Sequence, residues 1–381
     1  LDGRRAARSL TDLGTAFWVA EGAEDGPWRQ PGAVEWLREI ESSLGVIGGE
    51  AARKHLELGP PPSETTEPPR ETGGALELND FLDRSHRDLR REVLTLLSDP
   101  ALDIPVGLEY GEYRERVLDG VKLLAHRGFG SYAFPEAYGG KDDPAGSIAI
   151  FESLAFGDLS VLVKFGVQFG LFGGSIHQLG TSRHHETYLE RAGTLDLPGC
   201  YAMTETGHGS NVRDLETTAH YDPADRTVVI HTPHEDAGKD WIGNAAVHGR
   251  IATVFARLVV DGVDHGVHAI LVPIRDESGN VLPGVRIEDR GLKVGLNGVD
   301  NGRIWFDQVR VPVDNLLDRF ATIDESGRYE SPITSSGRRF FTMLRRRSSQ
   351  HRFGVRERGQ GLADHRGAAG GCPSPVRPPG R

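Results

Sequence analysis

Cysteine and long apolar runs are scarce in this chain of 381 residues. Its two cysteines, Cys200 and Cys372, are too few for a disulfide framework, which favours a reducing compartment. No run of eighteen apolar residues occurs, so we expect no membrane-spanning helix. The chain begins without a basic-then-apolar leader and ends without a peroxisomal address. We therefore expect a cytoplasmic location, with the peroxisome as the alternative.

The signatures of several enzyme classes are also missing. The sequence has no G-x-S-x-G nucleophile elbow, no phosphate-binding P-loop and no complete G-x-G-x-x-G fingerprint after a strand. Hydrolase, NTPase and standard dinucleotide-binding functions therefore lack their usual local support.

Three histidine pairs raise the question of a metal site. They are His184 with His185, His231 with His234, and His265 with His268. The last pair lies on an expected strand, where residues three apart face opposite sides. We interpret all of them as surface or turn histidines and expect no metal.

The charge balance is acidic, with a net charge of −11. Residues 345–381 contain nine arginines against one glutamate and one aspartate, or 9 − 2 = +7, so residues 1–344 carry −11 − 7 = −18. An acidic body repels polyanions through its long-range field. We expect no nucleic-acid partner, and we expect any anionic ligand to be held by local donors.

Periodicity divides the chain. Apolar residues recur at helical steps up to about residue 198, with helices expected at 113–126 and 175–191 and very apolar ones at 147–156 and 160–170. Short β-branched segments follow at 227–231, 251–260, 267–272, 285–288 and 303–306. This order predicts an α+β fold with an antiparallel β domain. The predicted parts are an unassigned extension (1–58), a Pro-rich linker (59–75), a helical domain (76–198), a β domain (199–325), the start of a further helical region (326–344) and a disordered tail (345–381).

Residues 201–211 (YAMTETGHGSN) place two glycines around one histidine. Because Gly207 and Gly209 have no Cβ, their backbone can approach a ligand closely. Thr204 and Ser210 add hydroxyl groups that both donate and accept hydrogen bonds. Taken alone, the spacing favours an ordinary glycine turn between two strands.

A second stretch, residues 239–246 (KDWIGNAA), places Trp241 beside small, hydrogen-bonding residues. An indole can pack on a flat heteroaromatic ring while backbone amides meet the edge of that ring. A core tryptophan at a strand end would explain the same pattern. A third stretch, residues 291–312, combines a glycine-rich hairpin with a strand, and we interpret it as structural.

Together these motifs resemble those of the acyl-CoA oxidases in the acyl-CoA dehydrogenase superfamily, over residues 76–344. The matching motifs are YAMTETGHGSN (201–211), DWIGNAA (240–246) and GLNGVDNGRIWFDQVRVP (295–312). The dehydrogenase branch typically has T-E-P-G-A-G-S-D in the first motif, whereas the form with His208 resembles the oxidase version. The resemblance implies an N-terminal helical domain followed by an antiparallel β domain of the acyl-CoA dehydrogenase type, with the C-terminal helical domain missing.

The resemblance also implies an activity. It is FAD-dependent α,β-desaturation of a fatty acyl-CoA to the trans-2-enoyl-CoA, with O2 reoxidising the flavin and releasing hydrogen peroxide. By matching positions, Met203, Thr204, Trp241 and Gly243 would bind FAD, and Ser210 would contact the CoA arm of the substrate. The family further implies a homo-oligomer.

One expected group has no match. The reaction requires a carboxylate within hydrogen-bond reach of the α-proton, and the family uses a glutamate in a motif like Y-E-G-[DE]-N. Tyr329-Glu330 is followed by Ser331-Pro332 and is no substitute, so we expect no catalytic base in this chain. The tail after Leu344 resembles a shifted reading frame of GC-rich coding sequence. Two alternatives stay open: an inactive truncated fragment that at most binds FAD or acyl-CoA, and a dehydrogenase that passes electrons to a carrier protein.

Overall fold

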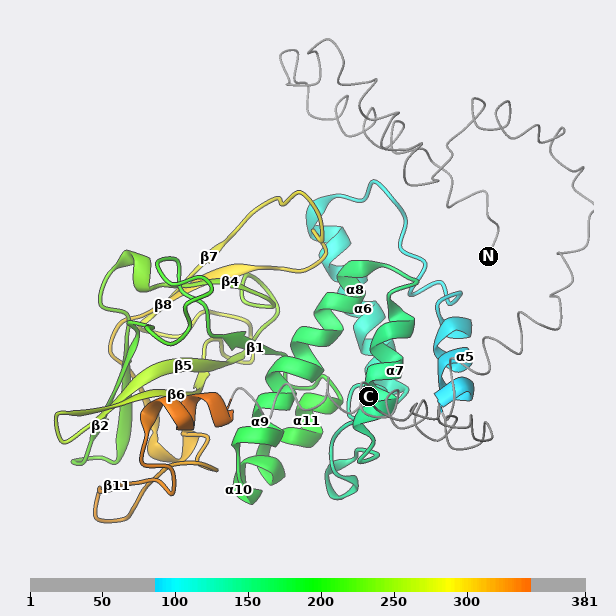
Figure 1. Cartoon of the computed structure of the whole chain (residues 1–381). Coiled ribbons are helices and arrows are strands. Elements are labelled where there is room, and N and C mark those ends of the chain that lie inside the picture. Colours follow the sequence, from blue (N-terminus) through cyan, green and yellow to red (C-terminus); the bar gives the residue numbers. More distant parts are fainter. Residues whose placement is uncertain (1–85, 344–381) are drawn as a thin grey trace, which may run out of the picture. The chain divides into compact units, whose positions relative to one another are not determined.

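The computed structural model describes residues 86–343, which lie within the second of the two compact units of the chain, Leu78–Arg381 (Figure 1). The predicted N-terminal extension, the Pro-rich linker and the tail at 345–381 lie outside the described residues. Within the described part, helices precede strands along the chain, so the predicted α+β fold is confirmed.

The helices follow the apolar periodicity of the sequence. They are α5 (Arg87–Leu96), α6 (Tyr110–His126), the short η3 (Glu136–Tyr138), α7 (Pro144–Leu154), α8 (Leu159–Phe165), η4 (Gly166–Gly173), α9 (Gly174–Leu179), α10 (Ser182–His184), η5 (His185–Leu189) and α11 (Glu190–Gly193). Asp143 and Asp158 begin α7 and α8 by accepting hydrogen bonds from first-turn amides, as N-cap residues do. The helix expected at 175–191 is interrupted, because the extended backbone of Gly180 ends α9.

The helices α8, η4 and α9 form one continuous helical segment, Leu159–Leu179. Its middle part, η4, has the wider π-helical turn, which places the buried Gln168 side chain against the carbonyls of Ala192 and Leu197 and the N–H of Gly199. By length and composition alone this segment could cross a membrane, but 61% of its most apolar window is buried inside the protein. Core helices of soluble proteins meet the same test, so the segment is only weak support for a span.

The strands form one large sheet and two small ones. In the large sheet, β5 (Ile251–Val260) pairs with β6 (Val263–Pro273), β1 (Gly199–Ala202) and β2 (Thr218–Asp222), and the sheet continues through β3 (Thr227–His231) to β9 (Val309–Pro312). The second sheet has the order β4–β8–β7, with β4 at Lys239–Ile242, β8 at Gly302–Phe306 and β7 at Val285–Asp289. A third sheet joins β10 (Thr322–Ile323) to β11 (Tyr329–Glu330).

The large sheet is mixed, which corrects the prediction of an antiparallel domain. Both β1 and β2 run parallel to β5, whereas the other pairings are antiparallel. Strand spacing along the sequence suggests hairpins, but β1 and β5 are joined through long intervening segments that allow a parallel pairing. The individual strand predictions are confirmed to within a few residues.

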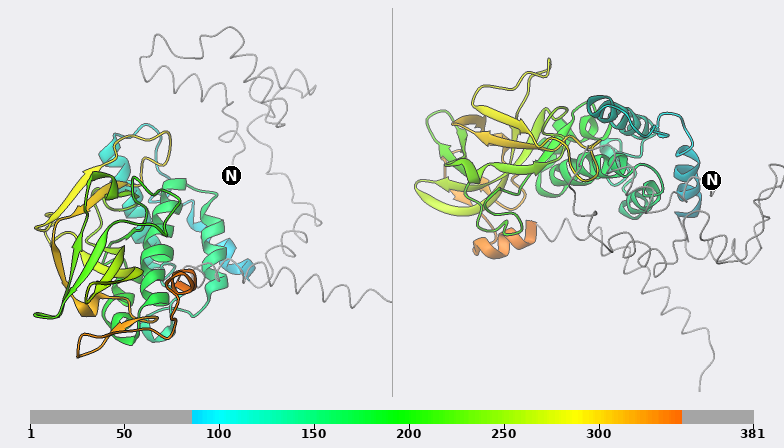
Figure 2. Two further views of the ribbon diagram at one scale, coloured as in Figure 1. Left: turned by 60° about the vertical axis from the view of Figure 1, so that its left-hand side comes forward. Right: turned by 90° about the horizontal axis from the view of Figure 1, so that it is seen from above.

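The helical and β parts share a hydrophobic core. Phe172 and Ile176 of the long helix pack with Phe255 of β5 and Leu271 of β6, and all four are buried. A second core lies within the β part, and a third lies among α6, α7 and α8. The views in Figure 2 show the long helix running beside the large sheet from two further directions. This shared core holds the helix against β5 and β6, and Met203 of the first motif belongs to it.

The predicted orientation of two histidines in β6 requires a correction. Strand alternation predicts opposite faces for His265 and His268, but a bulge shifts the β5–β6 register and Gly266 adopts a φ of +80°. Both rings therefore contact Tyr329: His265 stacks on it at 3.7 Å between ring centroids, and His268 lies edge-on at 5.6 Å. Among the described residues, no group of three or more His, Cys, Asp and Glu side chains could hold a metal ion.

Candidate functional site

The first two motifs lie side by side at the end of β1. The chain leaves β1 after Ala202 and runs along β4, where the Thr204 hydroxyl donates to the backbone oxygen of Asp240 at 2.7 Å. The Asp240 N–H donates back to the Thr204 carbonyl at 3.0 Å, and the Thr206 N–H donates to the Gly238 carbonyl at 3.1 Å. Residues 36 positions apart are thus joined as neighbouring extended segments.

A buried ion pair joins the same two segments. The Lys239 Nζ lies 2.8 Å from Glu205 Oε1, and both side chains have no exposed surface. Lys239 also donates to the carbonyls of Met203 and Phe255, and Glu205 accepts from both the N–H and the hydroxyl of Thr217. Burial opposes ionisation of Glu205, but Lys239 and the surrounding donors outweigh it and lower the pKa of that carboxyl. The pair therefore holds the first motif against β4.

Trp241 lies on the surface of this arrangement. Its backbone has a φ of +60°, and the residue is 53% exposed, although it is large and aromatic. The Arg290 guanidinium covers its ring at 4.5 Å from the centroid. Asn301 donates to its carbonyl at 3.0 Å. This exposure argues against a fully buried core tryptophan, and the packing of Trp241 on a ligand ring stays a prediction.

Gly243 lies against the long helix. A Cβ at this position would come within 2.9 Å of Val167 Cγ2, so only glycine fits without movement of the helix side chain. Met203, which precedes Thr204, is buried with 7% exposure. Met203 and Thr204 therefore lie beside the start of the segment that carries Trp241 and Gly243, and the role of these four residues in binding FAD stays a prediction.

The donor set can be compared with the needs of a flavin. A flavin is a flat heteroaromatic ring with polar edges, which suits a half-exposed indole beside a threonine hydroxyl. The Thr204 proton already points to Asp240, so the hydroxyl oxygen is available chiefly as an acceptor. A Cβ at Gly209 would meet nothing within 4 Å, so the motif backbone there is open. These residues fit FAD.

Ser210 lies in an exposed turn after this contact region. Its neighbour His208 bonds to Glu216 Oε1 at 2.7 Å, and His234 bonds to Glu216 Oε2 at 2.7 Å. One carboxylate thus ties the turn of the first motif to the segment before β4. Ser210 itself is positioned by this turn rather than by the strands, and its predicted contact with CoA stays a prediction.

Sequence reasoning missed a buried network behind the second motif. Lys164 of α8 contacts Asp300, Asn244 and His248, and the lysine and aspartate are almost fully buried. The third motif, interpreted from sequence as structural, supplies Asp300 and also Asn301. A lone lysine in the apolar run LSVLVKF was the available signal.

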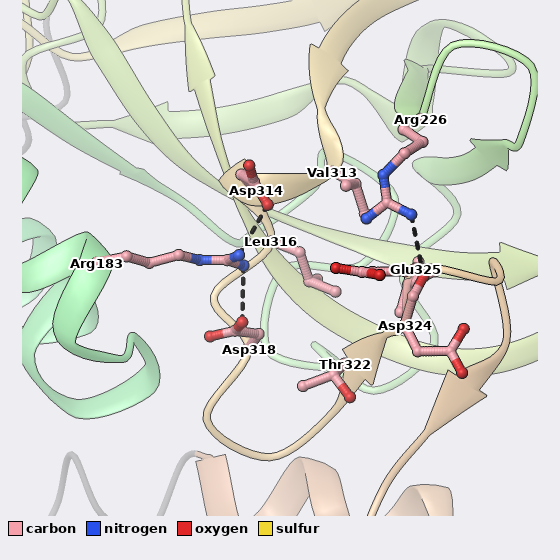
Figure 3. A pocket seen from close by; sticks show the side chains of 10 residues that line it. Arg183, Arg226, Val313, Asp314, Leu316, Asp318, Thr322, Asp324 and Glu325 are labelled. Carbon is pink, nitrogen blue, oxygen red and sulfur yellow. Dashed lines mark hydrogen bonds and ion pairs between the residues drawn. The ribbon is translucent and has the colours of Figure 1, made fainter.

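A groove of about 680 Å³ lies elsewhere, between α10 and the segment after β9 (Figure 3). Arg183 forms ion pairs there with Asp314 and Asp318, both at 2.7 Å, and Arg226 donates to the Asp324 carbonyl. None of the predicted flavin or CoA residues lines it. Its arginines are engaged with the protein, so this groove is not the site that the motifs define.

Comparison with known families agrees with this geometry. Residues 84–195 match the acyl-CoA dehydrogenase N-terminal domain, and residues 200–309 match the acyl-CoA dehydrogenase middle domain. The chain therefore belongs to the acyl-CoA dehydrogenase family.

Within that family, its relatives are acyl-CoA oxidases. It is 43% identical over 281 residues to the peroxisomal acyl-coenzyme A oxidase 2 of Arabidopsis thaliana, covering 71% of this chain and 40% of that protein. The solved acyl-CoA oxidase 1 of Yarrowia lipolytica superposes with a TM-score of 0.63 and 30% identity, over 72% of this chain and 39% of that one. The Caenorhabditis elegans acyl-CoA oxidase-2 bound with FAD, ascaroside-CoA and ATP has a TM-score of 0.57 and 29% identity, over 69% and 39%. The chain thus spans about 40% of the length of these relatives.

Proposed function

We propose that this chain supplies the FAD-binding and acyl-CoA-binding parts of an acyl-CoA oxidase that converts fatty acyl-CoA to trans-2-enoyl-CoA. The observation that supports this most directly is the hydrogen-bonded contact between Thr204 and Asp240, which presents the exposed Trp241 beside a threonine hydroxyl. The C. elegans relative is solved with FAD, ascaroside-CoA and ATP, which supports the same cofactor for this chain. We also propose the domain division at 198/199, where β1 begins.

The residues have distinct roles in this proposal. Bound FAD would supply a two-electron acceptor for the substrate β-carbon and a reaction with O2 that gives hydrogen peroxide. Trp241 would pack on the ring, Thr204 and the backbone at Met203 and Gly243 would meet its polar edge, and Ser210 would contact the CoA arm. Because the chain is acidic overall, phosphates would be held by these local donors rather than by a general positive field.

The proton acceptor is not assigned. The family glutamate in a Y-E-G-[DE]-N motif has no match in this chain, and Tyr329 belongs to β11, where it contacts His265 and His268. Our proposal for this chain is therefore that it binds and orients FAD and acyl-CoA. The flavin and peroxide measurements below decide whether it also catalyses the reaction.

The location and the assembly that we propose for this chain are based on its relatives. The Arabidopsis relative is named peroxisomal, which favours the peroxisome over the cytoplasmic location expected from sequence. We therefore propose a peroxisomal protein, and imaging of a fluorescent fusion would test this. A homo-oligomer is proposed on family grounds, and light scattering of the purified chain would test it.

The central experiment is purification of the full chain and measurement of its flavin absorbance. Retained FAD, and peroxide released when a fatty acyl-CoA is added under air, would support the oxidase. Bleaching of the flavin without peroxide, followed by turnover once an electron acceptor is added, would indicate a dehydrogenase. A folded protein that binds neither added FAD nor acyl-CoA would refute the proposal.

A matched pair of variants locates the site. Thr204→Val should weaken FAD binding about five-fold, which corresponds to one lost hydrogen bond of ~1 kcal/mol. Thr218→Val is the control, because the Thr218 hydroxyl forms one long hydrogen bond of 3.4 Å, to the His231 carbonyl within the large sheet. Equal affinities for both variants would place the flavin elsewhere.

A further inference from the structure

A buried polar network connects the long helix to the second motif. Lys164 of α8, which is 1% exposed, places its Nζ 2.5 Å from Asp300 Oδ1, 2.7 Å from Asn244 Oδ1 and 2.9 Å from His248 Nδ1. The second Asp300 oxygen accepts from the N–H groups of Val247 and His248 at 2.9 and 3.0 Å. The network thus joins one helix of the helical part to the backbone that follows β4.

Opposite charges meet in this network. Burial opposes ionisation of Asp300, but Lys164 and His248 outweigh it and hold the pKa of that carboxyl well below its usual range. His248 Nδ1 lies 3.1 Å from Asp300 Oδ1 and its Nε2 lies 2.9 Å from Glu115 Oε1, so the ring links the two carboxylates. The buried Lys164 cation has two oxygen acceptors, on Asp300 and Asn244, and removal of either one leaves it less satisfied.

The network acts on a backbone segment with unusual geometry. Trp241 and Asn244 have φ values of +60° and +66°, a region in which asparagine is tolerated and tryptophan is rare. The Asn244 amide donates to the Gly199 carbonyl at 2.8 Å while its oxygen accepts from Lys164. Asn301 holds the carbonyl of Trp241 at the other end. A non-glycine residue in this sparsely populated backbone region costs free energy, and the conformation persists only where surrounding contacts impose it.

The same helix touches this segment twice. Lys164 contacts Asn244, and one turn later Val167 Cγ2 lies 2.9 Å from where a Cβ of Gly243 would stand. The helix therefore meets this segment at both Gly243 and Asn244.

We propose that Lys164 is a positioning residue which, with Asp300 and Asn244, holds the backbone of residues 241–244, left-handed at Trp241 and Asn244, in the conformation that presents Trp241 and Gly243 to FAD. The inference rests on the proposed function for its ligand and extends that function to helical residues outside the three motifs. A network that only fastened the helix to the sheet would stabilise the protein without setting this segment.

Two variants and one control separate these roles. Lys164→Met removes the cation, and Asn244→Gly removes both side-chain bonds while glycine still tolerates the positive φ. Thr253→Val is the control, because the Thr253 hydroxyl forms a buried 2.8 Å hydrogen bond with Ser175 on the same long helix rather than with residues 241–244. All three proteins are full chains, compared by melting temperature, by FAD titration and by hydrogen exchange of the peptide covering 239–249 without FAD.

We expect both network variants to weaken FAD binding by about ten-fold or more and to speed hydrogen exchange in the 239–249 peptide, with the control within about two-fold of wild type. If Asn244→Gly leaves exchange in that peptide unchanged, the proposal is wrong, whether or not Lys164→Met folds. Equal losses of FAD affinity in the control and in Asn244→Gly at equal melting temperature would also overturn it. Should wild type bind no FAD, the proposed function fails, but the exchange comparison still decides whether the network positions the segment.

Discussion

Replacing Lys239 by methionine removes a buried cation from the contact between the first two motifs. The Lys239 side chain has no exposed surface and lies 2.8 Å from Glu205, 3.2 Å from the Met203 carbonyl and 2.6 Å from the Phe255 carbonyl. Methionine has a similar length and fills the same space, so the change tests charge and hydrogen bonding more than packing.

The expected loss is large. Removal of one partner from a buried ion pair typically costs ~3–5 kcal/mol, because the other charge stays buried without compensation. Glu205 would keep the N–H groups of Glu216 and Thr217 and the Thr217 hydroxyl, so we expect the lower end, about 3 kcal/mol. Against a total stability of roughly 5–15 kcal/mol, this is a substantial fraction.

A double-mutant cycle supplies the control. Glu205→Gln should also cost about 3 kcal/mol, because Lys239 then has only neutral acceptors. The combined Lys239→Met/Glu205→Gln variant should lose about 2 kcal/mol less than the sum of the single losses, since it leaves no unpaired charge. Urea unfolding near neutral pH, followed by far-UV circular dichroism, measures all four proteins.

A Lys239→Met loss below about 1 kcal/mol would refute the reasoning, because it would mean that the carboxylate finds other compensation or that water reaches it. Strict additivity in the cycle would show that the two residues do not stabilise each other. Either result would remove the ion pair as the link that holds the first motif on β4.

Two further predictions follow from single contacts. Gly243→Ala should destabilise the protein by ~1–3 kcal/mol because its Cβ meets Val167; thermal melts compare it with Gly209→Ala, where a Cβ meets nothing within 4 Å, and equal melting temperatures would show that the Val167 side chain moves aside without cost. The hydrogen bond that the His234 ring donates to Glu216 raises the pKa of the His234 imidazole above 6.5, a stabilisation present at lower pH and lost as pH rises through the raised value; NMR titration should show that pKa fall in Glu216→Gln, and an unchanged value would exclude the contact.

Local pattern was sufficient for much of the fold. The strands at 227–231 and 251–260 were predicted with the observed bounds, because alternating or continuous β-branched runs between turn residues have few other stable conformations. The helix expected from residue 113 to residue 126 begins three residues earlier, at Tyr110. Helix starts depend on capping and neighbouring contacts, which periodicity does not describe.

Features that depend on distant partners were not predictable in this way. The parallel pairing of β1 and β2 with β5 leaves no clear local signal, because β1 and β2 are only 4 and 5 residues long and the segments that connect strands decide their relative direction. The bulge at Gly266 also escaped prediction, and it turned His265 and His268 toward the same tyrosine. One inserted residue reverses the face of every residue on one side of it.

The candidate site likewise has features that the local sequence predicts and features that depend on distant contacts. Thr204, Trp241 and Ser210 can be singled out from their own motifs, because hydroxyls and an aromatic ring carry their chemistry with them, whereas Gly243 is assigned through the family resemblance. That the two motifs touch, with Thr204 on Asp240, follows only from the pairing of distant segments. The assignment of Lys164 to this site is likewise tertiary, since a buried charge acquires meaning from the acceptors that folding brings to it. Residue chemistry can be read along the chain, whereas the backbone conformation that presents it is set by contacts between residues far apart in sequence.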